Sequence, residues 1–285
     1  VVGATVTCGG AETTIRARRG VVLATGGFEW DEELKTTFLR GPLTSPASPP
    51  TNTGDGLKMA LTAGAGLGNM TSAWWIPTLS ESGARWPDNG APEKDAQRSV
   101  PVLIERTLPH SLMVNGQGKR FCNEATNYSA LAGAFHSFDP ATYGYNNLPA
   151  YLLVDSQYRG RYPIASVMPG DPSPDWIVEA PDLAGLADAI GVNAAQLEAT
   201  VSRFNTHAEN VSDPDFGRGV SAYDRFYGDR SRDGAAATLG RVEIGPFFAV
   251  RIDLGALGTN GGPRTNGMAQ VLNVYGDVIP GFYAA

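Results

Sequence analysis

The 285-residue sequence has few of the residues that build disulfide frameworks and metal centres. Its two cysteines, Cys8 and Cys122, are too few for a disulfide framework, and its three histidines lack the spacing of zinc ligands. It has no apolar run near the ~20 residues that span a membrane. Acidic residues outnumber basic ones by 29 to 22, and the resulting net charge of −7 does not favour binding to the negatively charged backbone of nucleic acid. We therefore expect no metal site, no transmembrane segment and no nucleic-acid partner.

Hydrophobic residues account for 42% of the chain and charged residues for 18%, which predicts a soluble globular protein with substantial cores. We expect a cytoplasmic protein and leave peripheral association with a membrane open. The chain has no initiator methionine, and its first and last residues both read as parts of strands. We therefore expect a fragment of a longer protein.

The most informative segment is residues 20–27 (GVVLATGG). Residues 21–24 form a short apolar run that is typical of a strand covered on both faces in a parallel sheet. Thr25, Gly26 and Gly27 then remove side-chain bulk where the strand ends, which is where ligands of open α/β sheets bind. A plain tight turn is the alternative, and these residues by themselves leave both interpretations open.

A second glycine turn, Thr53-Gly54-Asp55-Gly56, precedes an expected helix at 57–63. Backbone N–H groups and a carboxylate at a helix start can hold the polar part of a cofactor, and an Asp that only caps the helix is the alternative. Residues 64–68 (GAGLG) follow a helix and do not match G-x-G-x-x-G. No dinucleotide-binding fingerprint occurs in the sequence.

The rest of the chain mixes helical and strand patterns. A helix is expected from Trp30 to Phe38, where Asp31, Glu32 and Glu33 suit the positive end of the helix dipole. The other expected elements are short strands within 1–27 that turn at Cys8-Gly9-Gly10, a glycine hairpin joining strands 111–115 and 116–121, a helical stretch after Glu124, a strand at 150–154, helices at 182–190 and 193–210, and strands at 247–253, 269–275 and 279–285.

Seven motifs follow one another in an order that we associate with one family. They are 21–28 (VVLATGGF), 52–56 (NTGDG), 73–75 (AWW), 112–115 (LMVN), 118–121 (GKRF), 123–124 (NE) and 279–285 (IPGFYAA). With them the chain resembles, over essentially its whole length, the flavoproteins that include fumarate reductase, succinate dehydrogenase and the 3-ketosteroid Δ1-dehydrogenases.

The resemblance implies an α/β fold combined with α+β. A partial Rossmann-like FAD-binding domain would comprise residues 1–89 and 255–285, with an inserted α+β catalytic (capping) domain at 90–254. The residues implied to bind FAD are Ala24, Thr25, Gly26, Gly27, Thr53, Gly54, Asp55, Gly56 and Ala284. The family's G-x-G-x-x-G and its keto-binding Tyr-Pro-Gly-Ala-Gly would lie before Val1 and after Ala285.

One position separates the subfamilies. Fumarate reductases carry a proton-donating arginine five residues after the Asn of the Asn-Glu motif, and this chain has Tyr128 there. In this it is similar to the ketosteroid dehydrogenases, as it is at 106–109 (RTLP), 221–229 (SAYDRFYGD) and 245–250 (GPFFAV). The resemblance implies that Tyr128 is a general base that removes a proton beside a 3-keto group while hydride passes to the flavin. An external electron acceptor would then be needed.

Aromatic side chains would line a site for a steroid-like small molecule. Trp74, Trp75, His110 and Phe121 are the candidates, although Trp74 and Trp75 would equally fill a domain junction and His110 would equally be structural. Steroid dehydrogenases usually carry Gly where this chain has His110 and Tyr where it has Phe248.

Two alternatives to the steroid dehydrogenase stay open. One is a reductase of fumarate-like or other enone substrates in the same superfamily. The other is a truncated, non-catalytic remnant that cannot hold FAD, in which Tyr128 is an aromatic residue packed on a helix face. Recording whether purified protein absorbs like a flavin would separate the second alternative from an enzyme.

Overall fold

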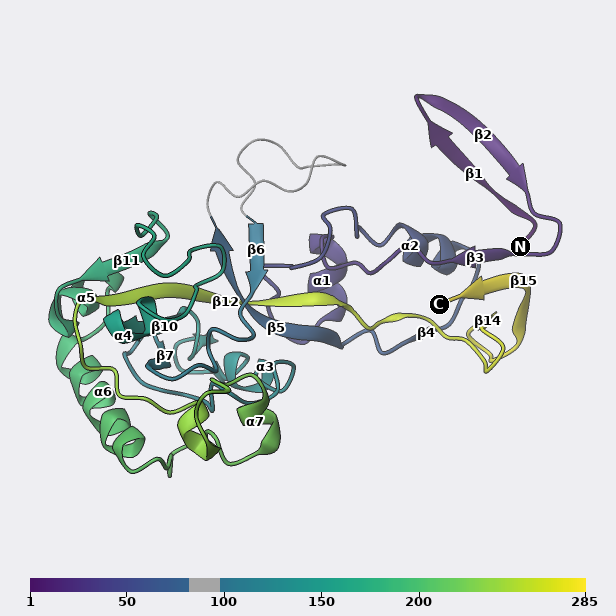
Figure 1. The fold of residues 1–285 in the computed structure, drawn as a ribbon. Coiled ribbons are helices and arrows are strands. Elements are labelled where there is room, and N and C mark those ends of the chain that lie inside the picture. The colour runs from purple at the N-terminus through teal and green to yellow at the C-terminus, as the bar shows by residue number, and fades with distance from the viewer. Residues whose placement is uncertain (82–97) are drawn as a thin grey trace. The chain divides into compact units, whose positions relative to one another are not determined.

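The computed structural model describes residues 1–81 and 98–285. These residues form two compact units, Val1–Trp74 with Ala256–Ala285, and Trp75–Gly255 (Figure 1). The predicted domain boundary after residue 89 lies outside the described residues. The predicted boundary after residue 254 lies one residue before the point, after Gly255, at which the chain passes from the second unit to the first. The assignment of an FAD-binding and a capping domain to these units remains a prediction.

The first unit combines short strands with two helices. Its elements are β1 (Gly3–Cys8), β2 (Ala11–Arg16), β3 (Val21–Leu23), α1 (Glu32–Phe38), α2 (Asp55–Thr62), β4 (Leu67–Gly68), β13 (Gly262–Pro263), β14 (Gln270–Leu272) and β15 (Val278–Ala284). β1 and β2 form the expected antiparallel hairpin, which turns at Gly9 and Gly10. The side chain of Asp31 caps α1 by accepting from the backbone N–H of Leu34 at 2.9 Å.

A three-stranded sheet in the order β14-β15-β3 forms the core of this unit. β3 pairs in parallel with β15, and Leu23 lies opposite Ala284. One face packs on α2 and its neighbours through Leu23, Ala60, Ala65, Val271, Phe282 and Ala284. The expectation that β3 is covered on both faces was wrong for this chain: Val22 is 64% exposed. Alternate residues of a strand point to opposite faces, and the described residues pack against only one of them.

The second unit is built on a larger sheet. Its strands are β5 (Ala73–Glu81, whose first two residues belong to the first unit), β6 (Arg98–Pro101), β7 (Ser111–Asn115), β10 (Ala150–Asp155), β11 (Ile177–Ala180) and β12 (Phe247–Thr259). They are ordered β6-β5-β12-β10-β7, with β11 also paired to β12. β10 is antiparallel to both β12 and β7. β12 continues past Gly255 into the first unit.

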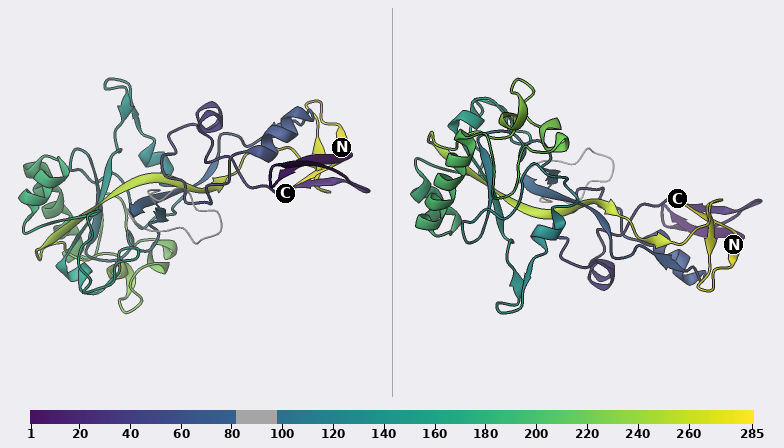
Figure 2. Two further views of the ribbon diagram at one scale, coloured as in Figure 1. Left: turned by 90° about the horizontal axis from the view of Figure 1, so that it is seen from above. Right: turned by 90° about the horizontal axis from the view of Figure 1, so that it is seen from below.

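Two amphipathic helices cover one face of this sheet (Figure 1). They are α5 (Leu183–Ile190), capped by Asp182, and α6 (Ala194–Glu209), capped by Asn193. Leu186, Leu197, Val201 and Phe204 of these helices pack on Leu112, Val114, Leu153, Phe247 and Ala249 of the strands. The remaining elements are α3 (Ala132–Phe135), β8 (Phe138–Asp139), β9 (Gly144–Tyr145), α4 (Ser156–Arg159), α7 (Ala222–Phe226) and a 3-10 helix at Gly234–Ala237. β8 and β9 form a hairpin that projects from this unit (Figure 2).

The sequence patterns of β10, α5 and α6 predicted these elements closely. The predicted hairpin between residues 111–115 and 116–121 was wrong, because β7 pairs with β10 and residues 116–121 form no strand. The Asn115 side chain accepts from the backbone N–H groups of Gln117 and Lys119, at 3.0 and 3.1 Å, and turns the chain back at once. The expected strand at 269–275 is shortened to β14, and the one at 247–253 is extended to Thr259. Among the described residues, none of the helices has the length and apolar character that a membrane span requires.

Candidate functional site

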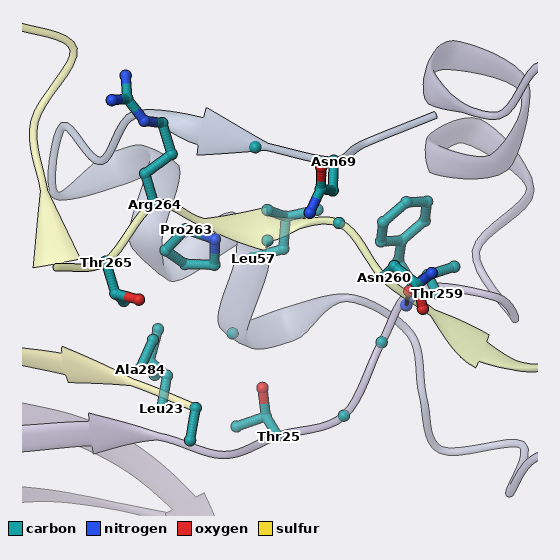
Figure 3. Close-up of a pocket in the computed structure, with 18 residues that line it drawn as sticks. Leu23, Thr25, Leu57, Asn69, Thr259, Asn260, Pro263, Arg264, Thr265 and Ala284 are labelled. Carbon is teal, nitrogen blue, oxygen red and sulfur yellow. Dashed lines mark hydrogen bonds between the residues drawn. The ribbon is translucent and has the colours of Figure 1, made fainter. Parts of the chain in front are cut away.

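A cavity of 570 Å³ opens in the first unit where β3 and β15 end (Figure 3). The carboxyl ends of parallel strands are the usual place for a ligand in an α/β sheet. The lining comes from the turn after β3, the start of α2, the end of β4, the segment after β12 and the last two residues. Its members are Leu23, Thr25–Phe28, Gly56, Leu57, Gly68, Asn69, Thr259–Thr265, Ala284 and Ala285.

Glycine is required in the turn after β3 because the surrounding atoms leave no room for a side chain. Gly26 has a φ of 76°, and a Cβ there would lie 2.5 Å from the side-chain oxygen of Asn52. A Cβ on Gly27 would collide with the side chains of Glu29 and Thr259. The cavity wall is therefore largely backbone, which allows a ligand to approach main-chain N–H and C=O groups closely.

A buried carboxylate fixes this wall. Glu29 is fully buried and accepts hydrogen bonds from Asn52 Nδ2 at 2.6 Å, from the Thr259 N–H at 3.2 Å and from the Thr259 hydroxyl at 3.3 Å. The Thr259 hydroxyl oxygen in turn accepts from the Phe28 N–H at 3.0 Å. Glu29 thus links three segments that are far apart in sequence, and its polar partners compensate for its burial.

The structure brings five of the predicted cofactor-binding residues to the cavity, namely Thr25, Gly26, Gly27, Gly56 and Ala284. The other four, Ala24, Thr53, Gly54 and Asp55, are not among its lining residues. Gly54 acts through the backbone: it is the N-cap of α2 with a φ of 74°, and its N–H donates to the carbonyl of Gly27 at 3.1 Å. Asp55 is the first residue of α2 and not its cap.

Sequence reasoning missed the other wall of the cavity, at Thr259–Thr265. The glycines at 258, 261 and 262 were the available signal. A Cβ on Gly261 would lie 2.6 Å from the Cα of Met70, so this segment also passes close to neighbouring backbone. Its course is set by backbone hydrogen bonds from Asn260 N to Ser72 O, 3.0 Å, and from Arg264 N to Gly66 O, 2.7 Å.

In the second unit, Tyr128 is half-buried and is the last residue of a loop, residues 123–128, that a buried arginine holds. Arg106 is fully buried and donates through Nη1 to the backbone carbonyls of Glu124 and Thr126, the latter at 2.9 Å. Its Nε donates to the Val102 carbonyl at 2.9 Å. Burial lowers the pKa of Arg106 to about 10, which leaves it charged at neutral pH.

The side chain of Glu124 anchors the same loop to β7. Its carboxylate accepts from Arg120 at 2.7 and 2.8 Å, from Arg218 at 3.2 Å and from the Met113 N–H at 3.1 Å. Burial raises the pKa of Glu124, but Arg120 and Arg218 outweigh this and hold the pKa at about 2. Arg120 also pairs with the buried Asp213 at 3.0 Å, so this loop is fixed by a network of buried charges.

The predicted substrate residues have different partners. Trp74 is 58% exposed and belongs to the first unit, whereas Trp75 is buried in the second and packs edge-on against His136. Phe121 packs edge-on against Phe135.

His110 has both ring nitrogens occupied. Its Nδ1 lies 2.7 Å from the Arg241 carbonyl, and its Nε2 lies 3.0 Å from Nη2 of Arg232. Because Arg232 can only donate, Nε2 accepts and Nδ1 carries the proton. His110 has a φ of 65°, a backbone conformation that favours glycine.

One cluster in the described part of the chain has the geometry to hold a cation. His207, Asp213 and Asp215 place their ligand atoms within 4.8 Å of one another. Asp213 is already paired with Arg120, and Asp215 with Arg203 and His207. The cluster is therefore explained by ion pairing, and the expectation of no metal site stays a prediction.

A backbone-lined cavity at the ends of parallel strands, in a chain of mixed helix and sheet, is typical of domains that bind a nucleotide cofactor. The whole chain, residues 1–285, matches the model of the family described as FAD binding domain. The chain belongs to this family, whose cofactor is FAD.

Three similar proteins are dehydrogenases of ring ketones by name. The 4-oxocyclohexanecarboxylate 2-dehydrogenase of Sinomonas cyclohexanicum is 44% identical over 95% of this chain and 46% of its own length. The 3-oxosteroid 1-dehydrogenase of Mycolicibacterium smegmatis is 40% identical over 95% of this chain and 47% of its own length. A crystal structure of 3-ketosteroid delta1-dehydrogenase from Sterolibacterium denitrificans, in complex with 1,4-androstadiene-3,17-dione, matches 99% of this chain and 50% of that one, with a TM-score of 0.87 and 34% identity.

The chain thus spans about half the length of the curated relatives it matches. The resemblance that the motifs indicated is confirmed, because the chain matches the FAD binding domain family and its relatives include 3-oxosteroid 1-dehydrogenases. The mixed helix-and-sheet fold matches that of a flavoprotein dehydrogenase.

Proposed function

We propose that this chain supplies part of the FAD site and the catalytic base of an FAD-dependent dehydrogenase that acts on ring ketones. The observation that carries the proposal is the backbone-lined cavity at the carboxyl ends of β3 and β15, in a chain that matches the FAD binding domain family throughout. The first unit would be the partial Rossmann-like FAD-binding domain, and the second the inserted capping domain.

The residues present fit a flavin nucleotide. Thr25, Gly26 and Gly27 would face it on one side and Thr259–Thr265 on the other, with Gly56 at the start of α2. Gly26 and Gly27 are hemmed in by Asn52, Glu29 and Thr259, so the backbone itself forms the contact surface. FAD, when bound, accepts hydride and passes electrons to an external acceptor.

Tyr128 would be the base. Its phenolate would take the proton from the carbon next to the ring ketone, while the neighbouring carbon gives up hydride to the flavin. The two hydrogens thus leave as H⁺ and H⁻, and a C=C bond forms between the two carbons. Two interactions hold the loop that leads to Tyr128: Arg106 binds backbone carbonyls of the loop, and the carboxylate of Glu124 binds the backbone N–H of Met113 in β7. Such support fixes the base relative to a bound substrate.

A saturated ring ketone is the substrate class that we propose. The substrates named for the two relatives share an oxo group on a six-membered carbocycle or a steroid, and both names describe dehydrogenation. Trp75, His110 and Phe121 are proposed substrate-side residues in the second unit, and Trp74 is one in the first. His110 would contact the substrate through the surface of its ring and not through a hydrogen bond, because both of its nitrogens are already bonded to Arg232 and to the Arg241 carbonyl.

The test uses the protein as its gene encodes it. We expect purified protein to absorb near ~450 nm as a flavoprotein, and to reduce a dye acceptor when given 4-oxocyclohexanecarboxylate or a saturated 3-ketosteroid. Tyr128→Phe should lower turnover by roughly 10²- to 10⁴-fold, the usual contribution of a general base, and leave the flavin spectrum unchanged. Wild-type turnover in Tyr128→Phe, or flavin-free protein after reconstitution, would rule the proposal out.

A further inference from the structure

Asn69 lines the cavity of the first unit and has a backbone conformation that few residues adopt. It follows β4 directly and has a φ of 54°. Residues other than glycine rarely have a positive φ, and asparagine is one of the few that tolerate it. Such residues gather at binding sites, where a side chain is needed although the backbone favours glycine. The turn after β4 thus keeps a carboxamide where glycine would satisfy the backbone.

The carboxamide of Asn69 has hydrogen-bonding groups that the protein does not use. Figure 3 shows the side chain extending from the end of β4 toward the other residues that line the cavity. The residue is exposed, and within residues 1–81 and 98–285 its side chain makes no hydrogen bond. A carboxamide offers two donor hydrogens and an acceptor oxygen. These groups are free to bind a molecule that enters the cavity.

Hydrogen bonds fix the turn that carries Asn69 to the opposite wall. Its carbonyl accepts from the Ser72 N–H at 3.0 Å, and the Ser72 carbonyl accepts from the Asn260 N–H at 3.0 Å. Asn260 Nδ2 also donates to the Ser72 hydroxyl at 3.1 Å. Just before the turn, Gly68 of β4 pairs with Gly262 of β13. The backbone of Asn69 is therefore in place before a ligand binds, which lowers the entropy cost of binding.

The charges beside this turn favour one part of FAD over another. Asn260 follows Thr259, whose N–H and hydroxyl donate to the buried carboxylate of Glu29 at 3.2 and 3.3 Å. The hydrogen-bond partners of Glu29 among the described residues, Asn52 and Thr259, are neutral. A carboxylate without a cationic partner repels a diphosphate, whereas the oxidised flavin ring is neutral and carries two carbonyls on its polar edge. This end of the cavity therefore suits the flavin ring.

We propose that Asn69 is a flavin-binding residue, whose Nδ2 donates a hydrogen bond to a ring carbonyl of FAD. The contact determines which end of FAD occupies this part of the cavity. Asn69 supplies a side-chain donor there, whereas the glycine turn after β3 supplies backbone. This inference rests on the proposed FAD site.

Asn69→Gly tests the proposal, because glycine adopts the positive φ and lacks only the carboxamide. If the turn needs Asn69 only for its backbone, this variant binds FAD with the wild-type Kd. A flavin-binding role predicts that the Kd for FAD, titrated into apoprotein made from the full gene product, rises roughly 3- to 10-fold, as the loss of one hydrogen bond implies. A carbonyl stretching band of the bound flavin should move to higher frequency, which a contact with the diphosphate does not produce.

Asn69→Asp is a second variant that keeps the size of the side chain and its tolerance of positive φ. It replaces the donor by a carboxylate, which only accepts hydrogen bonds. Its Kd for FAD should exceed that of Asn69→Gly, because a carboxylate then faces the ring carbonyl. Val211→Gly is the control. Val211 has a φ of 51° and belongs to the second unit, so glycine relieves the same backbone conformation away from the cavity and should leave the Kd unchanged.

Three results overturn the role of Asn69. They are a Kd of Asn69→Gly within twofold of wild type or of Val211→Gly, a wild-type Kd in Asn69→Asp, and unchanged carbonyl bands in Asn69→Gly. If wild-type protein binds FAD and any of these results is found, only the role of Asn69 fails. If wild-type protein binds no FAD after reconstitution, the proposed FAD site itself is wrong.

Discussion

Two loops that carry candidate site residues, 24–27 in the first unit and 123–128 in the second, are held in opposite ways. The first is shaped by glycines that leave no room for side chains, with Glu29 and Thr259 behind them. The second is held by long charged side chains, of which Arg106 and Arg218 reach it from elsewhere in the fold and Arg120 lies just before it in sequence. A cavity wall made of backbone needs small residues in sequence, whereas a loop held by side chains also needs partners from other parts of the chain.

Breaking the charged network should produce the largest effect on stability. Arg218 is fully buried and donates to Glu124 and to the carbonyls of Ser111 and Leu108. We expect Arg218→Met to lower the free energy of unfolding by about 3–5 kcal/mol, because it removes one partner of a buried ion pair. Urea unfolding monitored by tryptophan fluorescence measures this. Arg251→Met is the control, since Arg251 is exposed and its ion pair with Asp253 should contribute less than about 1 kcal/mol.

The same network gives the protein a defined acid dependence. The folded pKa of Glu124 is about 2, below the ~4.3 of an unfolded glutamate. A depressed folded pKa means that its contribution is complete above about pH 4.3 and is lost as the pH falls toward 2. Glu124→Gln should flatten the loss of stability across this window. An equal acid slope in wild type and Glu124→Gln would show that other carboxylates dominate.

An intermediate effect is expected in the glycine turn, where it should appear in cofactor binding as well as in stability. Gly27→Ala places a methyl group against Glu29 and Thr259 and should cost about 1–3 kcal/mol, as overpacking does. Titration with FAD should show weaker binding. Gly267→Ala adds the same methyl group where no atom lies within 4 Å, and should leave both quantities unchanged. Equal FAD affinity in the two variants would show that the turn does not need glycine.

The smallest effect is expected at His110, which combines a strained backbone with a bonded side chain. His110→Gly relieves a positive φ of 65° but loses the bonds to Arg241 and Arg232, so we expect a net change within about 1 kcal/mol. His110→Ala loses the bonds and keeps the strain. It should therefore be less stable than His110→Gly by about 1 kcal/mol, measured as the difference in unfolding free energy. The reverse order would show that the positive φ at this position stores no strain.

Local patterns predicted the elements whose cause is local. Asp182 and Asn193 cap α5 and α6, and the apolar residues of these helices face the sheet as their spacing indicated. The glycine turn after β3 was found for the same reason, because Gly26 and Gly27 are needed where they stand. The hairpin expected after Asn115 failed because partner choice in a sheet is not local: β7 pairs with β10, 35 or more residues further on.

The sequence by itself determined the family, the helices and the glycine turns, because motif order, apolar spacing and steric demand are properties of neighbouring residues. Tertiary structure decided which residues line the cavity, since Thr259–Thr265 reach it only through the fold. It also decided how Tyr128 is held. Arg106 and Arg218 meet at its loop because the fold buries together a carboxylate, carbonyls and guanidinium groups that lie far apart in the chain.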